Sequence, residues 1–553
     1  MRGLKTKALQ TFGIALTALL VWPQLASAQR RLTPIPHPIG SPQKAPVQAA
    51  RLASAASPWT PLTNQPNFLV DGSGNPILLM DGTVLVQDAG FPDWWKLTPD
   101  QNGSYVNGTW TEVASTPSGY SPLYHSSAVL PDGRLIIEGG EYNYDPTTGN
   151  FNAVWTNLGA IYDPVADKWT SVNPPDGWSS IGDAQSVVLP DGTYMQADCC
   201  STHAALLNPK TLTWRPTGKG KYDPNDEEGW TLLPNGKVLA VDAYVPIPPF
   251  PYIPAGKNYE LYSRRGDDES EDEGGGRWRV AGTTPVQLWD SWLTCGELSQ
   301  EPNNGPTFEL GPGVLRPDGT VFYTGSNTCP NEAGHTAIYN SYTNTWKAGP
   351  DFPHDINISD GPAALEVNGK VLMMASPGYG NPPVTFFEWD GKALKKVPGT
   401  PNAPTDGSYY GNMLVLPSGQ ILLTDFSDDI EVYTSSGGPR PEWAPKVVWA
   451  PEHVKRGRTY QTFGFRFNGF SQGAAYGDDA QAATNFPLVR ITNVKTGHVR
   501  YSRAHDPSSM AVASDDLNSV WFDVPADQES GYSKLEVVAN GIASEPVFVN
   551  VRK

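Results

Sequence analysis

The sequence predicts an all-β protein in which a seven-bladed β-propeller is followed by an immunoglobulin-like β-sandwich. Three observations predict this fold. A hairpin turn with glycine in its second position recurs seven times between residues 81 and 419, and short apolar runs ending in tryptophan follow several of these turns. After residue 440 both signals stop, while alternating strand-like runs continue. The chain has 53 Pro and 55 Gly and shows no sustained helical periodicity, which suits short strands joined by tight turns.

The stretch 124–169 shows one complete repeat. It reads YHSSAVLPDGRLIIEGGEYNYDPTTGNFNAVWTNLGAIYDPVADKW, with two apolar runs joined at a Pro-Asp-Gly turn, a third short run and a final tryptophan. Such a unit forms a four-stranded antiparallel sheet that needs neighbours of the same kind to bury both faces. The equivalent turns are Asp81-Gly82, Asp132-Gly133, Asp191-Gly192, Asn235-Gly236, Asp318-Gly319, Asn368-Gly369 and Ser418-Gly419. A four-stranded repeat of about 50 residues is typical of a kelch-type blade. Scattered turns in an ordinary β-sandwich are the alternative, but they give no reason for turn and tryptophan to recur in phase.

Four segments follow from these patterns. Residues 1–28 have a basic start, a short apolar stretch and an Ala-x-Ala end, which predict a signal peptide and a secreted, extracytoplasmic protein without membrane insertion. Residues 29–57 are rich in Pro, Ala and Ser and predict a flexible linker. The propeller is expected over 58–440 and the sandwich over 441–553.

The net charge limits the possible binding partners, and the cysteine count predicts disulfides. The formal net charge of −18 makes nucleic acid an unfavourable partner, and we expect a monomer. Four cysteines in an exported chain suggest two disulfides. Cys199 can pair with Cys200, leaving Cys295 with Cys329, or the pairs can cross. The acidic run 267–273 predicts a solvated loop; a calcium loop is the alternative, although its acids do not alternate as in such loops.

The geometry of the blades places acidic and tyrosine side chains on one face of the propeller. The residues before the first strand and those after the second lie at the same end of each hairpin, near the axis. Aligned on the turns, the first set is Tyr124, Asp183, Glu227, Leu310, Asp360 and Tyr410. The second set includes Asp88, Asp198, Asp242 and Asp425. We therefore expect an acidic funnel that carries tyrosines. The alternative is that these aspartates only bind turn amides.

The repeats and the C-terminal domain together resemble the galactose oxidase and glyoxal oxidase family of copper-radical enzymes over residues 58–553. The most specific match is Tyr124-His125-Ser126-Ser127 before the turn, with Gly139-Gly140 after it. The resemblance implies that Tyr124 is the radical-forming tyrosine and that Tyr142 stacks on it. It also implies copper, Tyr410 as the second tyrosine, and a C-terminal histidine that a loop sends into the axis.

His505 is the match for that histidine, with His498 as a competitor. Two members of the family's site are missing. Gly411 stands where the second histidine belongs, and the crosslinking cysteine expected near Asn75 is absent. The remaining metal set is Tyr124, Tyr410 and His505, completed by His125 or by funnel carboxylates. His203 and His335 begin equivalent third strands, which favours a structural role.

Three functions follow. The first is a metal-dependent oxidase, with copper as cofactor, of a small alcohol, an aldehyde or a sugar. The second is a non-catalytic propeller that binds a glycan or another cell-surface carbohydrate through its acidic, aromatic face. The third and weakest is a glycan hydrolase or lyase that uses paired carboxylates, such as Asp183 with Glu227 or Glu228.

Overall fold

The computed structural model describes residues 57–68, 72–243, 256–264, 275–289, 308–326, 333–378, 380–478 and 482–553. The regular structure of these ranges is β-strand, with two single-turn 3₁₀ helices, η1 (Ser408–Tyr410) and η2 (Pro441–Trp443). None of the helices described is long and apolar enough to cross a bilayer. The predicted leader, nearly all of the linker, the acidic run 267–273, Cys295 and Cys329 lie outside the described residues.

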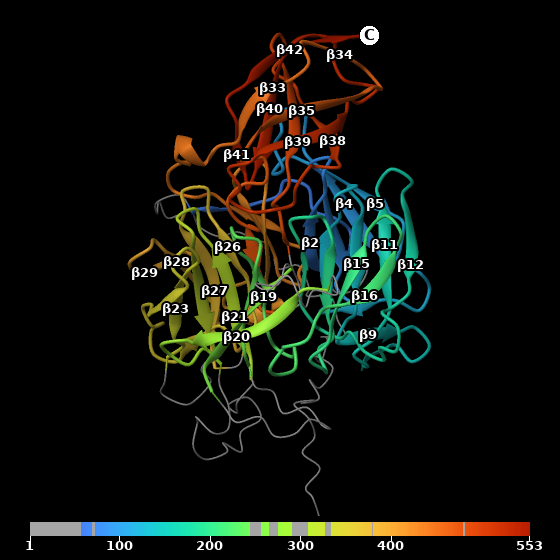
Figure 1. Ribbon diagram of the computed structural model, residues 1–553. Helices are drawn as coiled ribbons and strands as arrows, with labels where there is room; N and C mark the ends of the chain where they lie inside the picture. Colours follow the sequence, from blue (N-terminus) through green and yellow to red (C-terminus); the bar gives the residue numbers. More distant parts are fainter. Residues whose placement is uncertain are drawn as a thin grey trace, which may run out of the picture.

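The all-β propeller is confirmed (Figure 1). Among the described residues, six antiparallel sheets of four strands follow the blade order, and a further sheet has four such strands together with the short strands β25 and β36. Their strands are β2–β5 (Ser73–Leu78, Val84–Asp88, Trp94–Thr98, Thr109–Val113); β7, β8, β11 and β12 (Ser126–Val129, Leu135–Glu138, Gly159–Asp163, Lys168–Val172); β13–β16 (Ser186–Val188, Tyr194–Ala197, Ala204–Asn208, Thr213–Pro216); β17–β20 (Thr231–Leu232, Val238–Val241, Asn258–Ser263, Arg277–Thr283); β21–β24 (Leu310–Leu315, Thr320–Gly325, Thr336–Asn340, Thr345–Ala348); β26–β29 (Ala363–Leu365, Val371–Pro377, Thr385–Trp389, Leu394–Val397); and β30–β32 (Asn412–Val415, Ile421–Thr424, Glu431–Tyr433) with β1 (Trp59–Pro61).

The last sheet combines strands from the beginning and from the end of the propeller sequence. β1 pairs antiparallel with β32, with Trp59 opposite Tyr433, and the inner strand β2 contacts β30. These contacts bring the first and last sheets together. Two smaller additions decorate the ring: β6 (Pro122–Leu123) pairs with the hairpin β9 (Tyr142–Asp145) and β10 (Asn150–Ala153), and β25 (Ile356–Asn357) pairs with β27.

The recurring turn has a local physical cause. All seven turn glycines adopt φ between 76° and 86°, a left-handed conformation that favours glycine. In each turn the preceding Asp, Asn or Ser side chain accepts a hydrogen bond from the backbone N–H two residues on, at 2.9–3.5 Å. The Asp-Gly pattern of the sequence therefore encodes the turn directly.

Indole N–H groups connect neighbouring blades. Each of four tryptophans donates a hydrogen bond to a backbone carbonyl outside its own sheet. The donations run from Trp59 to Pro398, from Trp110 to Asn64, from Trp169 to Ala114 and from Trp214 to Asn173, at 2.7–3.0 Å. A residue that both fills the space between sheets and satisfies a carbonyl explains why tryptophan recurs in phase with the turn.

The C-terminal strands form a two-sheet sandwich. One sheet contains β33 (Lys446–Trp449), β35 (Thr459–Phe465), β39 (Leu517–Asp523) and the end of β38 (Val499–His505). The other contains the start of β38, β37 (Leu488–Asn493), β40 (Gly531–Ala539), β42 (Val547–Arg552), β34 (His453–Lys455) and β41 (Ile542–Ala543). Figure 1 shows the sandwich at one end of the propeller.

The sandwich docks on the end of the propeller where the repeat turns lie. Backbone N–H groups of the sandwich donate to carbonyls at three successive blade turns. These bonds join Ala504 to Met80, Asp506 to Pro131 and Met510 to Pro190, at 2.6–3.0 Å. The opposite end of the propeller, where the predicted funnel residues lie, is therefore free of this interface.

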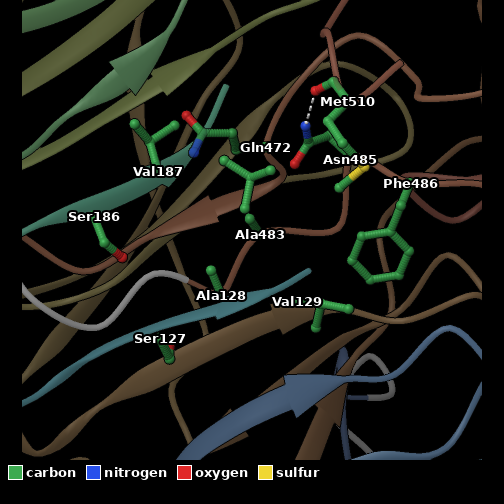
Figure 2. A pocket seen from close by; sticks show the side chains of 11 residues that line it. Ser127, Ala128, Val129, Ser186, Val187, Gln472, Ala483, Asn485, Phe486 and Met510 are labelled. Carbon is green, nitrogen blue, oxygen red and sulfur yellow. Dashed lines mark hydrogen bonds between the residues drawn. The ribbon is translucent and has the colours of Figure 1, made fainter. Parts of the chain in front are cut away.

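One segment of the sandwich leaves it and enters the propeller. This axial loop lies between β35 and β37, and its described residues are 466–478 and 482–487. Its strand β36 (Ala474–Ala475) pairs with β26, and the Gln472 side chain accepts the backbone N–H of Leu232 at 2.7 Å. Figure 2 shows the loop facing β7 and β13 across a small cavity. The axis of the propeller is therefore filled by a segment from the C-terminal domain.

Candidate functional site

Three blades present a side chain to the axis from the same unusual backbone conformation. Tyr124, Glu227 and Asp360 occupy equivalent positions before their first strands and have φ of 52°, 59° and 60°. Non-glycine residues are uncommon in this left-handed region, and each such residue costs about 1 kcal/mol or more. Because the three residues share this backbone conformation at equivalent positions, their side chains leave the blades in similar directions. Strained residues of this kind concentrate at functional sites.

Six acidic residues meet at this end of the propeller and form the axial carboxyl cluster. Its members are Asp183, Asp226, Glu227, Glu309, Asp360 and Asp478. Carboxylate oxygens of Glu227, Asp360 and Asp478 lie within 4.8 Å of one another. The Glu309 side chain is hydrogen-bonded to both Glu227 and Asp360. Asp478 comes from the axial loop, so the cluster combines four blades with the C-terminal domain.

Burial and mutual repulsion make these carboxyl groups hard to ionise. Burial raises the pKa of Asp183 to about 6 and, with the added charge of Asp183, that of Asp360 to about 7. Burial, followed by the charges of neighbouring carboxylates, raises the pKa values of Asp226, Glu227 and Glu309 well above their ordinary range. Buried acids at this density require compensation, either by protons or by a cation.

Tyrosines line the same region. The Tyr124 hydroxyl is buried and has no hydrogen-bond partner among the described residues. Its ring centroid lies 6.2 Å from those of Tyr142 and Phe426 and 6.4 Å from that of Tyr476. Burial raises the pKa of the Tyr124 hydroxyl well above its usual value, with Tyr409 and Asp360 adding to the effect. Tyr124 is therefore a neutral phenol among aromatic rings at the edge of the carboxyl cluster.

Tyr410 also packs against Phe426. Its ring centroid is 5.6 Å from that of Phe426, and its hydroxyl accepts a hydrogen bond of 3.2 Å from the Tyr409 hydroxyl. The structure thus brings Tyr142 against Tyr124, and Phe426 contacts both Tyr124 and Tyr410.

The structure does not bring His505 to these tyrosines, which corrects the expected metal set of Tyr124, Tyr410 and His505. His505 ends β38, with Nδ1 at 2.8 Å from a carboxylate oxygen of Asp506 and Nε2 at 3.6 Å from one of Asp523. The next residue is bound to Pro131 at the turn end of the propeller. Pro131 and Tyr124 lie at opposite ends of β7, about 20 Å apart at about 3.3 Å per residue. The physical reason is that His505 belongs to a strand of the sandwich rather than to the axial loop.

Among the described residues, no other histidine belongs to a group of side chains close enough to share a metal ion. His125 is buried, with Nε2 at 3.0 Å from the Gln87 side-chain oxygen and Nδ1 at 3.1 Å from the Ser126 carbonyl, and burial lowers its pKa to about 4. His498 contacts Glu529 in the sandwich, and His335 contacts Asp351. The axial loop instead delivers Tyr476 and Asp478, which sequence reasoning missed.

Two of the aspartates that follow the second strands are held by hydrogen bonds from neighbouring side chains. Asp198 accepts hydrogen bonds from the Ser180 and Ser201 hydroxyls, and Asp425 accepts them from Ser427 and Asn402. Glu228, a candidate partner of Asp183, instead binds the ammonium of buried Lys221 together with Asp223 and Glu260. Asp183 and Glu227 are the members of the proposed acid pairs that reach the axial cluster.

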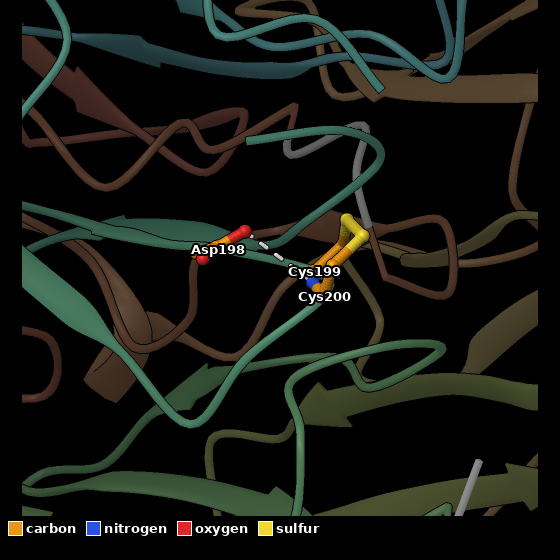
Figure 3. Close-up of side chains that lie close together, drawn as sticks. All are labelled: Asp198, Cys199 and Cys200. Atoms are coloured by element: carbon orange, nitrogen blue, oxygen red, sulfur yellow. Dashed lines mark hydrogen bonds between the residues drawn. A yellow bond between two sulfur atoms is a disulfide. The ribbon is translucent and has the colours of Figure 1, made fainter. Parts of the chain in front are cut away.

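A disulfide between adjacent residues borders the cluster. Cys199 forms a disulfide with Cys200 (Figure 3). The sequence had left open whether these two residues pair with each other or with other cysteines. The Cys199 sulfur lies within 4.8 Å of carboxylate oxygens of Asp183 and Asp226. The backbone N–H of Cys200 donates to Asp198 at 3.3 Å. The disulfide therefore fixes the loop that precedes β15 against the acidic side of the site.

Comparison with known proteins supports the kelch-type repeats. No protein-family model matches the sequence. Kelch-like protein terF of Aspergillus terreus is 31% identical over 136 residues, which are 24% of this chain and 27% of that protein. The match thus spans about a quarter of the relative's length.

Solved structures show a distant architectural likeness. A fungal alcohol oxidase of the AA5 family in complex with copper matches with a TM-score of 0.47 at 13% identity, over 90% of this chain and 99% of the oxidase. A streptogramin B lyase matches with a TM-score of 0.42 at 11% identity, over 68% and 96% of the two chains.

Proposed function

We propose that this kelch-type, galactose oxidase-like propeller binds a small hydroxyl-bearing ligand, a carbohydrate or a related alcohol or aldehyde, at the axial carboxyl cluster. The observation that carries the proposal is the meeting of Asp183, Glu227 and Asp360 with the unpaired hydroxyl of Tyr124. Carboxyl and phenol oxygens match the donors and acceptors of sugar hydroxyls, and the surrounding aromatic rings offer faces for a sugar ring. Neutral ligands are favoured over anionic ones, since further negative charge would be repelled.

Calorimetric titration of neutral oligosaccharides and small polyols, with uronic acids as the anionic comparison, tests this proposal. Tyr124→Phe is the sharpest variant, because it removes a hydroxyl that makes no hydrogen bond within the described protein. Loss of one neutral hydrogen bond to the ligand should weaken binding by about three- to tenfold. Glu112→Gln, at an exposed position of β5, is the matched control and should bind as wild type does. Binding of uronic acids alone, or an equal affinity of the Tyr124→Phe protein, would contradict the proposal.

The copper that the family resemblance implies fits these residues poorly. The described residues of the axial cluster provide carboxylates and phenols but no histidine, whereas imidazole is the ligand typical of copper sites. Tyr124 packs against Tyr142, and both Tyr124 and Tyr410 contact Phe426. The family resemblance gives these three tyrosines a role in oxidation, so oxidation is the second candidate function. Copper reconstitution followed by assay of peroxide from primary alcohols and aldehydes tests it. We expect no peroxide above the level of the Tyr124→Phe protein.

A two-carboxylate hydrolase is less favoured. Glu227, Asp360 and Asp478 have oxygens within 4.8 Å of one another, closer than the separations of about 6.5–9.5 Å in inverting and about 5–5.5 Å in retaining glycosidases. We further propose that the chain is exported, since a disulfide between Cys199 and Cys200 favours an oxidising compartment.

A further inference from the structure

Three carboxylates from distant parts of the chain have the geometry of ligands around one ion. Glu227 lies before β17, Asp360 before β26, and Asp478 in the axial loop, yet their oxygens lie within 4.8 Å of one another. Calcium binds carboxylate oxygens at about 2.3–2.6 Å, so two of its ligand atoms can lie up to about 5 Å apart. The spacing therefore accommodates a calcium-sized cation without movement of the backbone.

A fourth carboxylate points independently to a missing partner. Asp183 is 8% exposed, and its Oδ1 has no hydrogen-bond partner within the described part of the chain. One of its carboxylate oxygens lies within 4.8 Å of an oxygen of Asp226, another member of the cluster, and its charge acts on Asp360 and Glu309. A buried carboxylate oxygen without a donor is costly unless a cation or a proton compensates it.

The same propeller contains a second buried acid cluster that shows how compensation is achieved. Asp223, Glu228 and Glu260 surround the ammonium of Lys221 at 2.6–3.0 Å. Burial acts on Asp183, and the charged groups that act on Asp226 and Asp360 are carboxylates. Within the described residues, an ammonium group thus compensates one acid cluster, and no Lys or Arg takes that place among the groups that act on these three acids.

We propose that the axial carboxyl cluster binds one divalent cation, Ca²⁺ by preference, through Glu227, Asp360 and Asp478. An oxygen-only donor set suits Ca²⁺, Mg²⁺ or Mn²⁺ better than copper. Calcium is favoured among these because it tolerates an irregular ligand shell, whereas Mg²⁺ requires a near-octahedral one. The ion would join the axial loop to two blades and so link the sandwich to the propeller. This binding goes beyond the proposed ligand recognition and does not require the ligand.

The test uses the full chain after chelator treatment and dialysis. We expect Ca²⁺ to raise the melting temperature in proportion to the logarithm of its concentration, and calorimetry to show a site that Asp478→Asn and Glu227→Gln each weaken at least tenfold. Removing one of several like charges should leave the metal-free variants as stable as the wild type, or more stable. Asp515→Asn, which changes an exposed carboxylate of the sandwich, is the control and should bind Ca²⁺ normally.

Two results would overturn the inference. One is a melting temperature of the wild type that Ca²⁺ leaves unchanged. The other is an undiminished Ca²⁺ affinity in both variants, which would move any binding to other acidic residues such as 267–273. If a variant fails to fold, terbium emission excited through tyrosine in the wild type decides: we expect emission that Ca²⁺ displaces, and its absence refutes the site. Ligand titrations are separate, so failure of carbohydrate binding leaves the calcium result intact.

Discussion

Glu431 offers a quantitative test of how this propeller buries charge. It begins β32, is 0% exposed, and neither of its carboxylate oxygens has a hydrogen-bond partner in the described chain. Burial, followed by the charges of Asp425, Asp429 and Asp406, raises its pKa from 4.5 to about 9. The group is therefore protonated in the folded protein at pH 7 and ionised in the unfolded chain.

The sign of the effect follows from this difference. A raised folded-state pKa contributes stability that is complete below pH 4.5 and is lost as the pH rises towards 9. Between pH 4.5 and 7 the loss is about 3 kcal/mol, at about 1.4 kcal/mol per pH unit. Glu431→Gln replaces the protonated acid with a neutral group of similar shape. We expect this variant to match the wild type near pH 4.5 and to be more stable by about 2–3 kcal/mol at pH 7.

Denaturant unfolding of both proteins at pH 4.5, 6 and 7.5 measures this difference, with Glu112→Gln as the exposed control. The stability gained by Glu431→Gln should grow with pH, whereas the control should follow the wild type throughout. A Glu431→Gln protein that is less stable than the wild type at pH 7.5 would show that the carboxylate is ionised and partnered, and the reasoning would fail.

Three further predictions concern stability. Trp169→Phe removes the hydrogen bond from the indole to the Ala114 carbonyl and part of a buried ring, so thermal unfolding should show a loss of about 2 kcal/mol. Gly133→Ala should lower the stability by about 1–2 kcal/mol, because alanine is strained at the φ of 86°. A steric clash does not contribute, since a Cβ there would meet no atom closer than 3.5 Å, and Gly438→Ala in open space should be neutral in the same assay. His125, with its pKa held near 4 by burial, contributes stability above pH 6.5 that is lost as the pH falls towards 4, so melting curves of His125→Gln should depend less on pH across that interval than those of the wild type.

Part of the candidate site could be predicted because residues at equivalent positions of a repeat occupy equivalent places in the fold. Once the turns are aligned, Tyr124, Asp183, Glu227 and Asp360 must lie at the same end of their blades, whatever the details of packing. The member from blade five was misplaced by one residue: the alignment indicated Leu310, whereas Glu309 carries the carboxyl group. A register error of one residue is enough to exchange an inward side chain for an outward one.

The contribution of the C-terminal domain could not be predicted in the same way. A loop that enters the axis was expected, but the choice of His505 rested on residue type, and this residue proves to be tied to Asp506 and Asp523. The available signal was the long interval between β35 and β37, which lacks a regular alternating pattern and contains Tyr476 and Asp478.

The sequence by itself determined the elements whose cause is local. A glycine at positive φ after an Asp, Asn or Ser makes the same turn at all seven repeat positions. A tryptophan in phase with the turn packs against the neighbouring blade and donates a hydrogen bond to it. Only the tertiary structure decided which side chains meet at the axis. Asp478 reaches Glu227 and Asp360 across more than 100 residues of chain, because the sandwich docks on the turn end and threads one loop through the ring. No local pattern specifies that path, since it depends on how two distant parts of the chain pack together.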